Sequence, residues 1–229
     1  MSSGGVCTSA GQAPVLVEDG SVERESDMHT LFGNSTSGNC WKPAVMLHAR
    51  GLPFRWIEVD ILKGESRTPE FLRLNPNGRV PLLVLPDGRT LAESNAMLLH
   101  LGEGSAWLPT DPYLRAKTYE WLFFEQYSHE PYVATVRFWV RYAGKAEEKA
   151  QEIVERTARG HAALGVMEKA LSATPFLVGE QPTLADLALF AYTHVAPEGG
   201  FSLEPYPAIR GWLERVRAVP GFVPMPFHG

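Results

Sequence analysis

Two kinds of hydrophobic pattern follow one another along the chain. Short runs that alternate or are continuously apolar, as in β-strands, come at residues 28–32, 54–60 and 80–85. Segments with the spacing of a helix come at residues 40–50, 68–74 and 93–102. A very short apolar run follows Asp87-Gly88, a dipeptide that predicts a two-residue hairpin turn. In order, these elements predict a β-α-β-α-β-β-α unit over residues 28–104, an ordinary size for a small domain.

The second half of the chain shows helical patterns only. A long helix is predicted over residues 113–142 and should kink at Pro131. A second long amphipathic helix is predicted over residues 147–171, and a last one from residue 206 to residue 219. This half therefore predicts a bundle of helices.

One further helix in this half should be buried. Residues 184–190 are apolar nearly all round, which is typical of a central core helix. Thr183 and Asp186 stand at the spacing of a capping box with an acidic third residue. We predict two domains, an α/β domain at residues 28–104 and an all-helical domain at residues 112–221.

Composition and charge narrow the function. The chain has 229 residues, a formal net charge of −5 and no block of Lys and Arg, which argues against nucleic acids and anionic membranes as partners. No apolar run approaches the roughly 18 residues of a membrane span. The cysteines, Cys7 and Cys40, are too few for a disulfide framework, and the histidines are scattered, so we predict no metal site. Residues 1–27 lack the features of a signal peptide and are predicted to be a disordered extension. We expect a cytoplasmic protein.

The turn and strand around residue 80 predict a binding site for a small peptide. Val80-Pro81 opens a strand, and an X-Pro bond is the one place where a cis peptide costs little. A cis bond there would turn the Val80 backbone outward, free to pair with an extended peptide. Ser94, at a predicted helix start, offers its hydroxyl and backbone N–H groups to a carboxylate, and Glu93 offers a negative charge to an ammonium group.

This arrangement resembles the glutathione-binding half of the cytosolic glutathione transferases. The resemblance rests on Arg79-Val80-Pro81, on Glu93-Ser94 and on the capped core helix, and it extends from Met28 over nearly the whole chain. It implies a thioredoxin-like domain followed by a helical bundle. It also implies that Val80 pairs with the cysteinyl part of glutathione and that Glu93 and Ser94 hold its γ-glutamyl end. Arg79 is either a partner of the glycine carboxylate or a solvated loop residue.

Glutathione chemistry requires an ionised thiol, and a thiol with a pKa of about 8.5 needs a hydrogen-bond donor or a helix N-terminus to ionise at neutral pH. The family's disulfide reductases carry Thr-Pro-Asn-Gly-x-Lys at this place. The match to Ser37–Lys42 implies Ser37 as the first donor, with Ser35 as its weaker rival, Asn39 as the second donor and Lys42 as a glutathione contact. Cys40 is either an exposed thiol able to form a mixed disulfide or, turned inward, a small hydrophobic residue. No tyrosine ends the first strand, which excludes the Tyr-type mechanism.

The second substrate is less defined by the sequence. The aromatic stretch at residues 123–132 is the expected wall of an apolar pocket between the domains, with Tyr127, His129 and Tyr132 as candidates. We expect a homodimeric glutathione transferase that uses glutathione, without a metal, to detoxify a small hydrophobic electrophile. One alternative is a glutathione-dependent disulfide reductase or peroxidase, and another is a non-catalytic binding module on the same fold.

Overall fold

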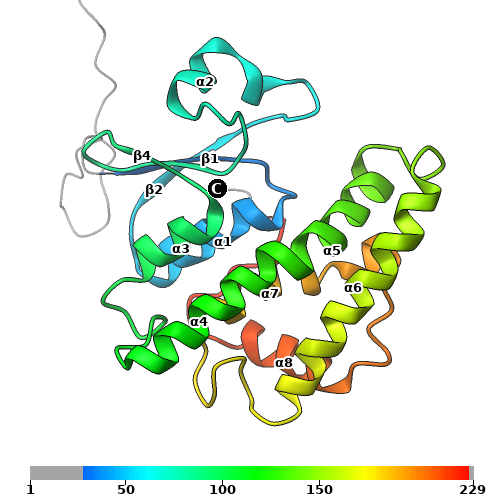
Figure 1. Cartoon of the computed structure of the whole chain (residues 1–229). Coiled ribbons are helices and arrows are strands. Elements are labelled where there is room, and N and C mark those ends of the chain that lie inside the picture. The colour runs from blue at the N-terminus through cyan, green and yellow to red at the C-terminus, as the bar shows by residue number, and fades with distance from the viewer. Residues whose placement is uncertain (1–27, 227–229) are drawn as a thin grey trace, which may run out of the picture.

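The computed structural model describes residues 28–226 (Figure 1). The predicted extension at residues 1–27, with Cys7, lies outside the described residues. The first half holds a four-stranded mixed sheet with the strand order β2-β1-β3-β4. The strands are β1 (His29–Gly33), β2 (Phe54–Glu58), β3 (Leu82–Val84) and β4 (Thr90–Ala92). β1 runs parallel to β2 and antiparallel to β3, and β3 and β4 form an antiparallel hairpin.

Three helices surround this sheet. Their bounds are Gly38–Ala49 for α1, Pro69–Leu74 for α2 and Ser94–Gly102 for α3, and a short 3-10 turn, η2 (Glu65–Arg67), precedes α2. α1 and α3 cover the face toward the helical half, while α2 lies on the other side (Figure 1). The Thr68 side chain accepts the Phe71 N–H and so caps α2, which has a proline in its first turn. The predicted element order of this half is confirmed.

Two local details differ from the sequence prediction. The Leu85 carbonyl accepts the Gly88 N–H, and the Leu85 N–H donates to the Arg89 carbonyl at 2.8 Å, so the β3–β4 loop has three residues instead of two. Gly88, with φ +82°, supplies the left-handed residue that this loop requires. α1 begins at Gly38, two residues before the predicted start, and Pro43 therefore lies in its second turn.

The second half consists of helices. The main ones are α4 (Pro112–Phe124), α5 (Glu130–Arg137), α6 (Ala150–Leu171), α7 (Leu184–Thr193) and α8 (Pro207–Arg217), with a 3-10 turn, η5 (Ala196–Gly199), before α8. Two π-helical segments, η3 (Glu125–His129) and η4 (Phe138–Tyr142), interrupt the helix that was predicted to be kinked by proline alone. A π turn inserts one extra residue and rotates everything that follows, so the side-chain register changes at Glu125.

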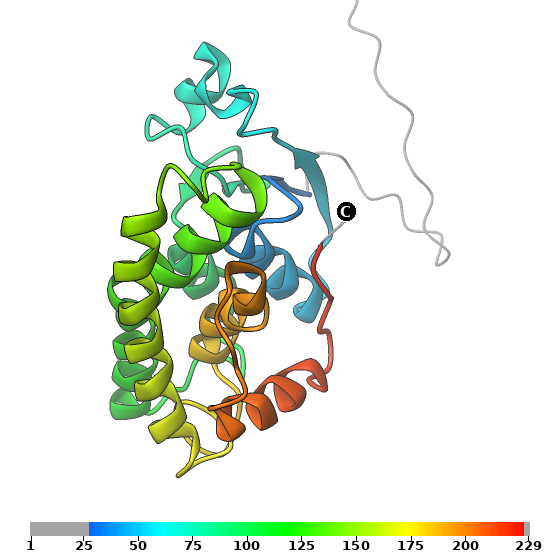
Figure 2. The same cartoon turned by 90° about the vertical axis from the view of Figure 1, so that its right-hand side faces the viewer.

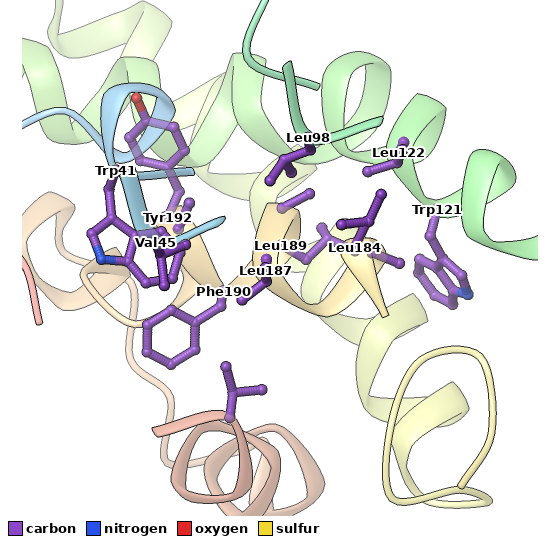
Figure 3. Close-up of a cluster of buried hydrophobic side chains, with 14 of the residues drawn as sticks. Trp41, Val45, Leu98, Trp121, Leu122, Leu184, Leu187, Leu189, Phe190 and Tyr192 are labelled. Carbon is purple, nitrogen blue, oxygen red and sulfur yellow. The ribbon is translucent and has the colours of Figure 1, made fainter. Parts of the chain in front are cut away.

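α7 is the central helix of the core, as predicted. Figure 3 shows its side chains between Trp41 and Val45 of α1 on one side and Trp121 and Leu122 of α4 on the other. The capping box at its start is present, because the Thr183 N–H donates to the Asp186 carboxylate at 2.8 Å while the Thr183 side chain meets the third N–H of the helix.

The last described residues lie against the α/β half of the molecule. After α8 the chain turns back toward α1, as the red segment in Figure 2 shows, and the Trp41 indole N–H donates to the Val223 carbonyl at 2.7 Å. None of the helices in the described part combines the length and apolarity needed to cross a membrane.

Candidate functional site

A hollow of about 320 Å³ lies where the start of α1, the turn before β3 and the start of α3 meet the helical half. Its lining includes most of the residues predicted to bind a peptide and activate its thiol: Ser37, Asn39, Arg79, Val80, Pro81, Glu93 and Ser94. Glu130, at the first position of α5, contributes from the helical half. Segments that are far apart in the sequence therefore form one concave polar site.

The strand-edge part of the site has the predicted form. The Val80–Pro81 peptide bond is cis, and Val80 precedes the β3 ladder, which begins at Leu82. The Asn75 side-chain amide donates to the Arg79 carbonyl at 2.8 Å and fixes this turn from beneath. Arg79 is exposed and lines the hollow beside Val80.

The clamp residues stand at the N-terminus of α3. Glu93 is exposed at φ +69°, which makes it the one non-glycine residue between positions 28 and 226 with positive φ. Such strained backbone persists where the surrounding structure holds it, and it is concentrated at ligand sites. The buried Ser94 is the first residue of α3, so its N–H belongs to the group of unpaired helix N–H donors that favours an anion.

Beneath Ser94 lies a buried ion pair. Lys42 and Glu125 have fully buried side chains, and their charged atoms are 2.8 Å apart. The remaining Lys42 contacts go to Ser94 Oγ at 3.4 Å and Asn95 Oδ1 at 3.1 Å. Lys42 was predicted to contact glutathione, but it does not line the hollow and instead supports Ser94 from below. Glu125 and Asn95 had not been singled out, because each belonged to a predicted helix with no motif of its own.

Asn39 continues this network to the helical half. Its Oδ1 accepts the Ser94 hydroxyl at 3.2 Å, and its Nδ2 donates to Glu130 Oε1 at 3.2 Å. Burial, and next the nearby Glu125 charge, raise the pKa of Glu130. The orientation of the Asn39 amide is therefore fixed, and one of its two N–H groups remains available to donate a hydrogen bond to a ligand.

Cys40 faces away from the hollow. Its side chain is fully buried, its Sγ accepts the Asn34 N–H at 3.3 Å, and burial raises the pKa of its thiol to about 11. A thiol in this environment is protonated at neutral pH and has little nucleophilic character. Of the two alternatives left by the sequence, the inward one matches this geometry.

A second hollow of about 720 Å³ adjoins the first and shares Ser37, Arg79 and Glu130 with it. Its helical wall comes from three residues at a spacing of four along α5 and η4: Ala134, Phe138 and Tyr142. Thr135 and the buried Arg137 add polar groups to this wall.

The three residues predicted for this wall lie elsewhere. Tyr127 is 83% exposed, and the Tyr132 hydroxyl accepts from Arg159 on α6. His129 is fully buried, and its Nε2 lies 3.0 Å from the Thr193 hydroxyl. The π turn at η3 changes the side-chain register of the helix, and the residues that line the second hollow lie further along it, in α5 and η4.

The sequence also gave no reason to assign Tyr192 to the site. This residue is 6% exposed at the end of α7, lines the second hollow, and accepts the Asn39 N–H on its hydroxyl at 3.2 Å. A signal was present, because a tyrosine in a helix that is otherwise apolar all round needs a partner for its hydroxyl. The identity of that partner depended on the fold.

Comparison with known proteins agrees with this arrangement. Residues 36–103 match the family model described as the N-terminal domain of glutathione S-transferase, and residues 123–220 match the model of its C-terminal domain. The predicted fold class is thereby confirmed.

Individual relatives point the same way. A crystal structure of a glutathione S-transferase from Pseudomonas fluorescens is 52% identical, has a TM-score of 0.85, and is matched over 86% of this chain and 98% of that one. Ure2p in complex with glutathione is 28% identical with a TM-score of 0.79 over 87% of this chain and 98% of that one. Among curated proteins, the disulfide-bond oxidoreductase YfcG of Escherichia coli is 32% identical over 80% of this chain and 87% of its own.

Proposed function

The chain belongs to the glutathione S-transferase family, and we propose that it binds glutathione in the first hollow and activates its thiol for attack on a small electrophile in the second. The observation that carries the proposal is the meeting of Val80, Glu93 and Ser94 with Ser37 and Asn39 in one hollow. The bound peptide would pair with the Val80 backbone, and its γ-glutamyl carboxylate and ammonium groups would meet Ser94 and Glu93. Arg79 is suited to the glycine carboxylate at the other end.

The proposed reaction begins with loss of the thiol proton to solvent. The hydroxyl of Ser37, with Asn39 beside it, stabilises the thiolate by donating a hydrogen bond to sulfur. The sulfur then forms a bond to the electrophilic carbon, and the electron pair of the broken bond departs with the leaving group. The thiolate needs these donors because its hydration is lost in the hollow, and donors fixed in advance replace that hydration at little cost.

A disulfide is the second candidate substrate. The wall of the second hollow combines Phe138 and Tyr142 with the polar side chain of Thr135, so it suits a molecule with both apolar and polar parts. The relative named as a disulfide-bond oxidoreductase supports this candidate. In that reaction the thiolate attacks one sulfur of the disulfide, forms a mixed disulfide and releases the other sulfur as a thiolate.

Calorimetric titration with glutathione tests the core of the proposal. We expect the wild type to bind, Ser37→Ala to keep the affinity, and the thiolate absorbance of bound glutathione to appear at higher pH in Ser37→Ala than in the wild type. Turnover of a chlorinated aromatic electrophile and of a glutathione mixed disulfide, measured side by side, distinguishes the two reactions. A wild type that does not bind glutathione would overturn the proposal and favour a non-catalytic role.

We further propose a cytoplasmic homodimer that removes small electrophiles. Large side chains are exposed on α4 and the turn after it: Tyr113, Phe123 and Tyr127, at 70%, 73% and 83%. Phe123 and Tyr127 are one turn apart, and exposed aromatic rings are typical of interfaces. Phe123→Glu combined with Tyr127→Glu should shift the protein to a monomer in sedimentation velocity. The matched control is Val154→Glu, at a position 71% exposed on α6, and this variant should remain a dimer.

A further inference from the structure

The N-terminus of α1 is capped by a group from the other half of the molecule. Ser37 is the N-cap residue, with an extended backbone, yet its side chain accepts no hydrogen bond from the helix. A serine in this position ordinarily accepts the N–H of the second or third helical residue. Here the second N–H, that of Asn39, donates to the Tyr192 hydroxyl at 3.2 Å, and the third, that of Cys40, donates to the Ser37 carbonyl at 3.1 Å. The Tyr192 hydroxyl therefore occupies the place of the serine side chain and leaves that side chain without a capping role.

The hydrogen bonds of Tyr192 set the direction of its proton. Because its oxygen accepts from Asn39, its O–H is available to an acceptor. Within residues 28–226, the other hydrogen-bonding neighbour of this hydroxyl is Ser37 Oγ at 3.5 Å. This distance is long for two hydroxyls, and a small rotation of the serine side chain shortens it; hydrogen bonds at catalytic groups often tighten when the substrate binds. Burial raises the pKa of Tyr192, so the phenol keeps its proton.

Exposure decides which hydroxyl faces the substrate. Ser37 lines both hollows, whereas Tyr192 is 6% exposed and lines only the second. Its ring leaves α7 and lies beside the blue ribbon of α1 in Figure 3. If Tyr192 donates to Ser37 Oγ, the serine proton cannot point back at Tyr192. It then has two acceptors within reach, the Cys40 sulfur, to which the Ser37 side chain also hydrogen-bonds, and the sulfur of a peptide bound in the hollow. If Ser37 instead donated to Tyr192, the peptide sulfur would have to reach the Tyr192 hydroxyl, which is the less accessible of the two.

The close approach that allows this contact is built into the chain. A Cβ added at Gly38 would lie 2.6 Å from the Ala191 carbonyl oxygen and 3.0 Å from the Tyr192 ring. Backbone cannot move aside as a flexible side chain can. A glycine in the first turn of α1 thus lets the end of α7 come within hydrogen-bonding distance of the loop that carries Ser37.

Resting on the proposed function, we propose that Tyr192 is a positioning residue that caps α1 in place of Ser37 and donates to Ser37 Oγ, so that the Ser37 hydroxyl is aimed at the glutathione sulfur. Tyr192 acts through Ser37 and does not itself contact sulfur. Without the Tyr192 hydroxyl, Ser37 would rotate to cap the free Asn39 N–H, as an N-cap serine ordinarily does.

The test is a double-mutant cycle on the pKa of the bound thiol, followed by thiolate absorbance. Tyr192→Phe keeps the ring in the core and removes only the hydroxyl. We expect it to raise the bound-thiol pKa by about one unit, a tenfold loss of thiolate at a fixed pH below that pKa, with little change in glutathione affinity. In the Ser37→Ala background the same substitution should change nothing further. Tyr206→Phe, which removes the hydroxyl that bonds His161 away from the hollows, is the matched control and should behave as wild type.

Two results would overturn the positioning role: no change in the thiol pKa on Tyr192→Phe, or an equal rise in the wild-type and Ser37→Ala backgrounds, which would mean direct contact with sulfur. A crystal structure of Tyr192→Phe gives an independent answer, with Ser37 Oγ expected within 3.2 Å of the Asn39 nitrogen, an ordinary hydrogen-bond distance; a serine that stays in place contradicts the proposal. If Tyr192→Phe fails to fold, the glutathione complex of the wild type decides, since Ser37 must lie between Tyr192 and sulfur. A wild type that binds no glutathione overturns the proposed function instead.

Discussion

The buried pair Lys42–Glu125 allows a quantitative test of how the two halves of the molecule depend on each other. Lys42 belongs to α1 and Glu125 to the π turn after α4, and both side chains are inaccessible to solvent. If Glu125 is replaced by Gln, the shape is kept but the lysine charge is left with neutral partners only, Ser94 and Asn95. Breaking a buried pair in this way costs about 3–5 kcal/mol, because an uncompensated charge stays out of water.

The same reasoning predicts a different result for the double variant. Lys42→Met alone leaves a buried carboxylate with two neutral donors, Asn95 and Gln126, and should again cost about 3–5 kcal/mol. Lys42→Met combined with Glu125→Gln removes both charges, and the glutamine oxygen can still accept those two donors. Replacing a whole buried pair by neutral groups is often close to neutral, so the double variant should lose roughly 2 kcal/mol or less.

Urea unfolding followed by tryptophan fluorescence measures these free energies, and each single variant should also lower the melting temperature by roughly 6–20 °C. Arg73→Met, at an exposed ion pair with Glu70, is the control and should be close to wild type. The decisive quantity is the coupling between the two positions. If the loss in the double variant equals the sum of the two single losses, the charges do not depend on one another, and this account of the pair is refuted.

Further predictions concern the ligand clamp, the core and one cap. Glu93→Gln and Ser94→Ala should each weaken glutathione binding about 10- to 150-fold in calorimetry, the value of one charge-assisted contact, without unfolding the protein; unchanged affinity in both contradicts the clamp. Burial lowers the pKa of His129 from 6.5 to about 4, so the stability it contributes is complete above pH 6.5 and is lost as the pH falls toward 4. The loss amounts to about 3 kcal/mol, and the slope of unfolding free energy against pH should flatten in His129→Gln. Thr183→Ala removes the cap of α7 and should cost about 1–2 kcal/mol in urea unfolding, with glutathione affinity retained.

The parts of the fold and site that the sequence predicted are those set by local chemistry. The capping box of Thr183 and the turn that carries Val80 depend on residues a few positions apart, and both form as expected. The second-substrate wall was expected at Tyr127, His129 and Tyr132 because they belong to an aromatic stretch of a long helix that was predicted to kink at Pro131. The π turn at η3 changes the side-chain register of that helix, and no composition signal marks it.

A different limit applies to residues that act across the fold. The Tyr192 hydroxyl reaches Asn39 over a separation of 153 positions, and Lys42 reaches Glu125 over 83. Such contacts depend on how α7 and α4 pack against α1, which a periodicity does not specify. In each case the sequence nevertheless shows a polar residue, Tyr192 or Lys42, within an apolar segment. Its need for a partner is a usable signal even where the partner cannot be named.

These contacts imply that the ligand clamp belongs to both halves of the molecule. The Ser94 hydroxyl, which is proposed to hold the γ-glutamyl end, lies in a continuous chain of hydrogen bonds that starts at Glu125 and passes through Lys42, Ser94 and Asn39 to Glu130. Both ends of that chain are carboxylates of the helical half, and its middle comes from the α/β half. A change that loosens the packing of α4 or α5 on α1 would therefore disturb Ser94 and Asn39 together. Loss of glutathione affinity in the Lys42 and Glu125 single variants, with recovery in the double variant, is the result this coupling requires.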